Sequence, residues 1–178
     1  MIIIKYEGRF GNNLFQYCRA LCEFKDSGHG IINPLNSKII KPPNPQNKNS
    51  KTVFQEGFFQ DKETVDLFKK NKSKLFENLD EIQGVFVHVR LGDIKNLFSC
   101  NKEYYEKALD NIDTSNGYIS SDSPNDKLVL HLIEKYNLKP YNKTEEETII
   151  FGSRFTNKVL SLGTFSWWIG FLGNQNNV

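Results

Sequence analysis

The chain has 178 residues, a formal net charge of +2 and 13% aromatic residues. This length suits one domain or two small ones, and the aromatic content excludes a disordered chain. Acidic and basic residues are interspersed, so nothing favours a nucleic-acid partner. No stretch approaches the roughly 20 apolar residues of a membrane helix, and the N-terminus does not resemble a signal peptide, so we expect a soluble, cytoplasmic protein.

The first half of the chain opens with a strand, a glycine-rich turn and a helix. Ile2–Lys5 is a β-branched run, and Gly8–Asn13 is the turn. The helix is indicated by apolar residues at helical spacing, namely Leu14, Tyr17, Cys18, Leu21 and Cys22. The three cysteines are an odd number without an export signal, which favours reduced thiols in the core over disulfides or metal ligands.

A long polar stretch then separates this unit from the rest. Residues 33–52 contain four prolines and many Asn and Lys residues, so we expect a surface loop. Aromatic residues return in Val53–Gln60, and Lys62–Leu79 has helical spacing.

The second half alternates strands and helices. We expect three strands, at Gly84–Val89, Gly117–Ser120 and Val159–Leu162. We expect four helices, at Glu103–Ile112, from the N-cap Ser123 to Tyr136, at Glu145–Phe151 and at Trp167–Leu172. Lys139–Asn142 is expected to be a loop. This alternation predicts an α/β fold with a mostly parallel sheet covered on both faces.

Arg90 is the most informative single residue. It follows the apolar run Gly84–Val89 and precedes a Gly92-Asp93 turn, which places a cation at the carboxyl edge of the sheet. Open α/β sheets bind ligands at that edge, and a guanidinium matches a phosphate or diphosphate in two-point contact. A strand end with a surface ion pair remains the alternative at this point.

Other turns of this kind converge on the same edge. Ser121–Ser123 and Gly163–Ser166 both follow predicted strands, as does Gly8–Asn13 in the first half. The backbone N–H groups and hydroxyls of Gly163–Ser166 suit an anion at a helix start, although an ordinary helix cap would have the same sequence.

Five segments in a fixed order resemble the motifs of the α-1,2-fucosyltransferases, glycosyltransferase family 11. Gly8–Tyr17 is similar to the family's Gly-x-x-Gly-Asn-Gln-x-Phe-Gln-Tyr, and Glu56–Asp61 to its Gly-Tyr/Phe-Phe-Gln. His88–Asp93 resembles His-x-Arg-Arg-Gly-Asp, and Ser121-Asp122 resembles Ser-Asp-Asp. Thr164–Trp168 reproduces Thr-Phe-Ser-Trp-Trp, the most specific of the five.

The chain also departs from the family pattern. Leu91 replaces the second arginine, Asn13 the glutamine, Ser123 the second aspartate and Gly163 a serine, and Ile94 replaces a frequent tyrosine. Relatives also continue beyond the position of the two tryptophans. These differences leave open reduced activity, an altered donor preference or an incomplete chain.

The resemblance implies a compact GT-B-like architecture of two Rossmann-like halves. Residues 1–80, with the loop 33–52, would form the acceptor-side half, and residues 84–178 the half that binds GDP-fucose. The implied reaction moves L-fucose from GDP-fucose to the 2-hydroxyl of a terminal galactose on a glycan, with inversion. The sequence has no Asp-x-Asp, so we expect no metal cofactor.

The resemblance and the positions together assign roles to individual residues. Arg90 would bind the diphosphate, and Asp93 is the candidate general base, with His88 as the alternative catalytic residue. The full donor-binding set is Arg90, Asp122, Ser121, Thr164, Phe165 and Ser166, and the residues expected to line the cleft are Gly8, Gly11, Asn12 and Gln16. Asp122 would orient Arg90 or accept from the nucleotide.

Two other functions remain open. One is a nucleotide-sugar-binding protein, a truncated or decayed relative that binds without turnover. The other is a carbohydrate-binding structural module, in which the Phe and Trp side chains form only the core and platforms for sugars. Such a module would bind glycans with no dependence on GDP.

Overall fold

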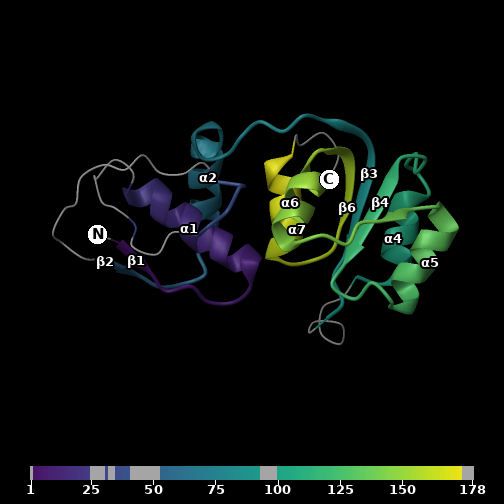
Figure 1. The fold of residues 1–178 in the computed structure, drawn as a ribbon, viewed down its shortest axis with the longest axis horizontal. Helices are drawn as coiled ribbons and strands as arrows, with labels where there is room; N and C mark the ends of the chain where they lie inside the picture. The colour runs from purple at the N-terminus through teal and green to yellow at the C-terminus, as the bar shows by residue number, and fades with distance from the viewer. Residues whose placement is uncertain (1, 25–30, 32–34, 41–52, 93–99, 174–178) are drawn as a thin grey trace. The chain divides into compact units, whose positions relative to one another are not determined.

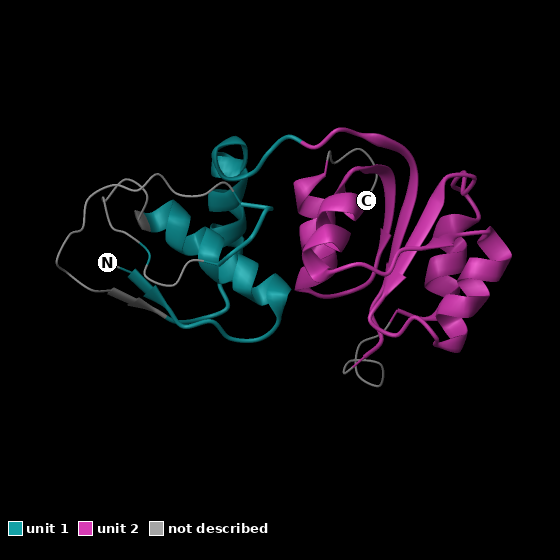
Figure 2. Ribbon diagram, viewed as in Figure 1, with its two compact units in different colours: residues 1–78 teal, residues 79–178 magenta. Residues whose placement is uncertain are grey.

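The computed structural model describes residues 2–24, 31, 35–40, 53–92 and 100–173 (Figure 1). The chain divides into two compact units, residues 1–78 and 79–178 (Figure 2), where the sequence predicts halves of 1–80 and 84–178. In the part of the chain that the structure describes, no helix is both long and apolar enough to cross a membrane.

The first unit pairs two short parallel strands with two helices. Its elements are β1 (Ile2–Ile4), α1 (Phe10–Phe24), β2 (Val53–Gln55) and α2 (Lys62–Leu75). Helix α1 packs on α2 through Phe15 and Phe68, whose ring centroids lie 5.6 Å apart. The predicted strand and both predicted helices are confirmed, with α2 ending four residues before the predicted Leu79 because Phe76 is extended.

The turn before α1 depends on a glycine. Gly8 has a φ of +79°, and a Cβ there would lie 2.2 Å from the side-chain nitrogen of Asn12. Of the predicted loop 33–52, only residues 35–40 are described, and Ile40 forms an antiparallel bridge with Phe76. The rest of that loop lies outside the described residues.

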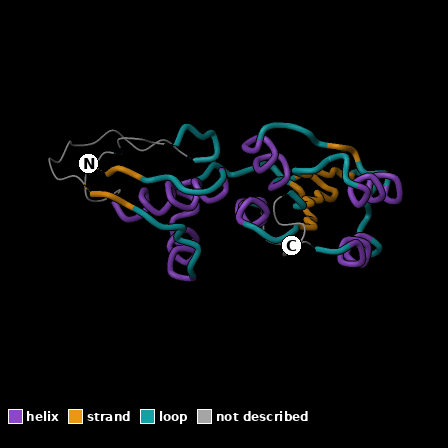
Figure 3. Tube along the Cα trace, turned by 90° about the horizontal axis from the view of Figure 1, so that it is seen from below, coloured by secondary structure: helices purple, strands orange, loops and turns teal. Residues whose placement is uncertain are grey.

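The second unit is a parallel sheet with the strand order β5-β4-β3-β6. Its elements are β3 (Ile82–Val89), α4 (Lys102–Leu109), β4 (Gly117–Ser121), α5 (Lys127–Tyr136), β5 (Lys139–Pro140), α6 (Glu145–Ser153), β6 (Phe155–Leu160) and α7 (Thr164–Leu172). Helices lie on both sides of the strands (Figure 3). The predicted α/β fold with a parallel sheet is therefore confirmed.

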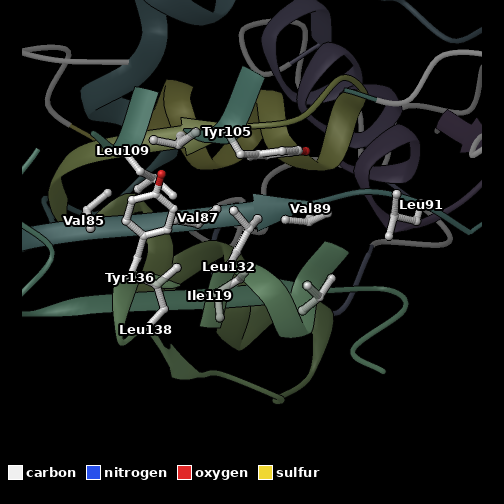
Figure 4. Close-up of a cluster of buried hydrophobic side chains, with 12 residues drawn as sticks. Val85, Val87, Val89, Leu91, Tyr105, Leu109, Ile119, Leu132, Tyr136 and Leu138 are labelled. Atoms are coloured by element: carbon white, nitrogen blue, oxygen red, sulfur yellow. The ribbon is translucent and has the colours of Figure 1, made fainter. Parts of the chain in front are cut away.

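The two faces of β3 belong to two different cores. Val85, Val87 and Val89 point toward α4 and α5 in one buried cluster (Figure 4). Phe86 points to the other face, where it contacts Phe151 and Phe155 with ring centroids 6.1 and 5.7 Å away. A strand buried on both faces reads as a continuous apolar run, which is why the sequence predicts it well.

Three predicted boundaries are wrong, and each has a local cause. The N-cap of α5 is Asp126 rather than Ser123, because the Asp126 carboxylate accepts from the backbone N–H of Leu128 at 2.9 Å. Strand β6 begins at Phe155 rather than Val159, because it pairs with β3 from Ile82 onward. The predicted loop at Lys139–Asn142 contributes the edge strand β5.

Gly152 of α6 is packed so closely that a larger residue is expected to destabilise the unit. A Cβ at this position would lie 2.6 Å from the Phe86 ring and 3.1 Å from Ile169. An alanine normally stabilises a helix relative to glycine, but here we expect Gly152→Ala to lower the free energy of unfolding by about 1–3 kcal/mol through overpacking. Urea unfolding of both proteins measures this, and an increase in stability would show that the helices have room to separate.

Candidate functional site

The topology of the second unit creates a switch point between β3 and β6. From β3 the chain moves outward through β4 to β5, and then returns to add β6 on the other side of β3. The helices that follow β3 and β6 lie on opposite faces of the sheet (Figure 1). Ligands of open α/β sheets bind at the carboxyl ends of such a strand pair. The residues at this position are Arg90–Gly92 after β3 and Ser161–Thr164 after β6.

Arg90 is held between the two neighbouring strands. Its Nε lies 3.5 Å from Oδ2 of Asp122, which follows β4. Its backbone N–H donates to the Ser161 hydroxyl, which follows β6, at 3.1 Å. The side chains of Arg90 and Asp122 are 17% and 23% exposed, so this ion pair is only partly shielded from solvent. The predicted cation at the sheet edge is therefore present and has a defined position.

Asp122 fixes the turn that follows β3. Its Oδ1 accepts from the backbone N–H of Leu91 at 2.9 Å and from that of Gly92 at 3.2 Å. A Cβ on Gly92 would lie 2.5 Å from Oδ2 of the same carboxylate, which explains the glycine. Of the two predicted roles for Asp122, these contacts favour the orientation of Arg90.

His88 lies below this edge in a buried polar cluster that also contains Ser161 and Ser166. Its Nδ1 is 2.7 Å from the Ser166 hydroxyl and 3.3 Å from that of Ser161, and the two hydroxyls are 3.0 Å apart. Burial lowers the pKa of His88 to about 4, against the opposing charge of Asp122 and with a further decrease from Arg90. The imidazole is therefore neutral at pH 7.

The start of α7 completes the edge. Its N-cap is Gly163, which has a φ of +115° and no side-chain cap hydrogen bond, and a Cβ there would meet nothing within 4 Å. Thr164 and Phe165 are half-buried, whereas Ser166 is buried in the cluster with His88. The positive end of the helix dipole therefore lies beside Arg90 at the switch point, since Ser161 contacts both Arg90 and Ser166.

The residues predicted from the N-terminal motif lie in the first unit. Gln16 is buried, with its Oε1 accepting from the N–H of Glu7 at 3.1 Å and its Nε2 donating to the carbonyl of Gly57 at 3.0 Å. Asn12 accepts from Gln60 at 3.0 Å. The first two motifs are thus joined to each other by hydrogen bonds. Gly8 and Gly11 belong to the turn and the first turn of α1, and the role of all four predicted residues in a cleft stays a prediction.

Other residues of the predicted site either lie outside the described part of the chain or make structural contacts. Asp93 lies outside the described residues. Ser121 accepts from the N–H of Ser123 at 3.0 Å, which shapes the turn after β4. Trp168 is wholly buried in α7, so this tryptophan is a core residue and not a platform for a sugar.

Cys18, Cys22 and Cys100 form no disulfide in the structure. Among the described residues, no three His, Cys, Asp or Glu side chains lie together as metal ligands.

Ser161 is the site residue that the sequence reasoning missed. The predicted strand Val159–Leu162 placed it inside the sheet, whereas β6 ends at Leu160 and leaves Ser161 at the edge. The available signal was a small hydroxyl residue two positions before Gly163, the glycine at which the next helix starts.

Comparisons with protein-family models, with curated proteins and with solved structures found no match. The resemblance to the α-1,2-fucosyltransferases therefore rests on the five sequence motifs, and the site itself rests on the geometry of the switch point.

Proposed function

We propose that the protein is an inverting glycosyltransferase that moves L-fucose from GDP-fucose to the 2-hydroxyl of a terminal galactose on a glycan. The observation that carries this proposal is Arg90, held by Asp122 and Ser161 at the switch point of a parallel sheet. The five motifs support the choice of donor and acceptor. The same proposal gives the chain a GT-B-like architecture, in which the second unit binds the donor and the first unit serves the acceptor.

The donor half of the reaction requires stabilisation of a departing diphosphate. The bond between C1 of fucose and the β-phosphate oxygen breaks, and GDP leaves with an additional negative charge. Arg90 supplies a fixed positive charge with N–H donors in a planar fork, and the start of α7 supplies a helix dipole. Thr164, Phe165 and Ser121 lie along the same edge as candidate contacts for the nucleotide.

The acceptor half requires a base. The galactose 2-hydroxyl attacks C1 from the side opposite GDP, and its proton passes to a carboxylate, for which Asp93 is the candidate by its position after Gly92. The transition state has oxocarbenium character, as in glycoside hydrolysis. His88 is engaged through Nδ1 with Ser166, so in this proposal it shapes the floor of the site while Asp93 takes the proton.

Leu91 favours the second candidate function, donor binding without turnover. The family pattern has a second arginine here, whereas Leu91 is 2% exposed and packs in the core with Val89 and Val129. The turn therefore presents a single arginine to the edge. A site with one cation would bind a nucleotide diphosphate and would stabilise the leaving group less strongly.

Calorimetric titration of GDP-fucose in EDTA, followed by a product assay with a galactose-terminated acceptor, separates these functions. The proposed enzyme is expected to bind GDP-fucose with a Kd on the order of micromolar and to form fucosylated product without added metal. Binding without product in EDTA or with added Mg²⁺ would leave the second candidate. Absence of binding to GDP-fucose and GDP would contradict both.

A further inference from the structure

The first unit has a carboxyl edge of its own, which the proposed donor site does not use. Strands β1 and β2 pair in parallel, with Ile4 opposite Gln55, so the segments that follow the two strands begin side by side. Lys5 and Glu56 are the first residues of these segments, and Nζ of Lys5 lies 3.4 Å from Oε1 of Glu56. Ligands of α/β sheets bind at the edge where parallel strands end.

The turn at residues 56–60, which follows β2, is fixed to helix α1 by two side chains. The buried Gln16 donates from Nε2 to the carbonyl of Gly57 at 3.0 Å. Gln60 donates to the side-chain oxygen of Asn12, also at 3.0 Å. These hydrogen bonds lie near the two ends of the turn, so the residues between them are held in a defined position.

The backbone of this turn has a conformation that few residues adopt. Gly57 has a φ of +126°, and Phe59 has a φ of +52°. A positive φ is common for glycine but is strained for a large side chain, and such strain is typical of binding sites. The Phe59 ring lies against Arg19, whose guanidinium carbon is 5.9 Å from the ring centroid. Phe58, between these two residues, has its side chain 46% exposed.

The surroundings of Phe58 match the chemistry of a pyranose sugar. Exposed neighbours in the two segments include Lys5, Glu56 and Gln60, so the ring is a small apolar surface among polar groups. A pyranose has the same division, with a face of C–H groups and hydroxyls around its rim. The Gln60 amide has two N–H donors and an acceptor oxygen, so it can bond a sugar hydroxyl as well as Asn12. A protein partner would need a larger apolar core at its interface.

We infer that Phe58 is a stacking platform for a pyranose sugar, with Gln60 as its hydrogen-bonding neighbour. The C–H face of the sugar lies on the Phe58 ring, and the Gln60 amide contacts a hydroxyl at the rim. This inference rests on the proposed function for the choice of galactose as the sugar, and it does not depend on transfer of fucose.

Titration of methyl β-galactopyranoside, followed by NMR, tests the inference. Phe58→Ala is expected to weaken the affinity about fivefold or more, the effect of one lost aromatic contact. Phe58→Tyr keeps the ring, so its affinity should stay within about twofold of that of the wild type. The Tm of both variants should be unchanged, because the side chain is exposed. The affinity for GDP should also be unchanged, since the proposed diphosphate site lies in the second unit.

Leu130→Ala is the matched control, because Leu130 is an equally exposed apolar residue on α5 of the second unit. It is expected to leave the affinities for galactoside and GDP unchanged. Equal galactoside affinity in Phe58→Ala and the wild type, or no galactoside binding by the wild type, would overturn the inference. Fucosylated product from the wild type would in that case leave the proposed function intact.

The opposite result is also distinguishable. Galactoside binding that weakens in Phe58→Ala, in a protein that transfers no fucose, would support the inference and overturn the proposed function. In a protein that does transfer fucose, Phe58→Ala should raise the KM for the galactose-terminated acceptor by the same factor as it lowers the galactoside affinity. A wild-type protein that binds neither GDP nor the galactoside would overturn both.

Discussion

Replacing Arg90 by alanine is expected to weaken the binding of GDP and GDP-fucose at least tenfold and to remove most transfer activity. Hydrogen bonds from a guanidinium to a diphosphate contribute about 1.5–3 kcal/mol each, so the loss of one or two of them accounts for this factor. The change also leaves Asp122 with its negative charge at the same edge, where it opposes an anion. Calorimetric titration of each protein with GDP measures the effect.

Two further variants separate the geometry of the guanidinium from its charge and from general effects. Arg90→Lys keeps the charge and loses the planar fork, so an affinity between those of the wild type and the alanine variant is expected. Arg154→Ala is the matched control, since Arg154 precedes β6 at the opposite edge of the sheet and donates to the carbonyl of Asp80 at 3.1 Å. Equal GDP affinity in the wild type and Arg90→Ala would mean that the diphosphate binds elsewhere.

The second large effect is expected from His88 and depends on pH. The pKa of His88 is about 4 in the folded protein and about 6.5 in the unfolded chain, so the unfolded chain takes up a proton first as the pH falls. Stability is therefore full above pH 6.5 and decreases as the pH approaches 4. For a shift of this size, the loss between pH 7.5 and pH 4 is about 3 kcal/mol.

The variant His88→Gln isolates this contribution, because glutamine does not titrate. The difference in the free energy of unfolding between the wild type and the variant, measured by urea unfolding from pH 7.5 to pH 4, should change by about 3 kcal/mol in favour of the variant at low pH. Asp122 and Arg90 are the charged groups whose fields act on His88, and they oppose each other. Parallel pH profiles for the two proteins would show that the imidazole titrates as an exposed histidine.

Much of the second unit could be predicted from local patterns. Strand β3 was predicted because it is apolar on both faces, and Arg90 and Asp122 were identified because polar residues after a parallel strand collect at one edge. Boundaries were less accurate where the choice was between two caps or two registers. Ser123 and Asp126 are both good N-caps, and only the observed hydrogen bond to Leu128 distinguishes them.

The sequence alone determined the α/β class, the parallel sheet and the arginine at its edge, since these follow from periodicity and from the residue types at strand ends. Only the tertiary structure decided the strand order, and with it the position of the switch point, because the pairing of β3 with β6 joins segments about seventy residues apart. It also decided which polar groups are satisfied. Ser161 became part of the site through contacts between distant segments, which no local pattern encodes.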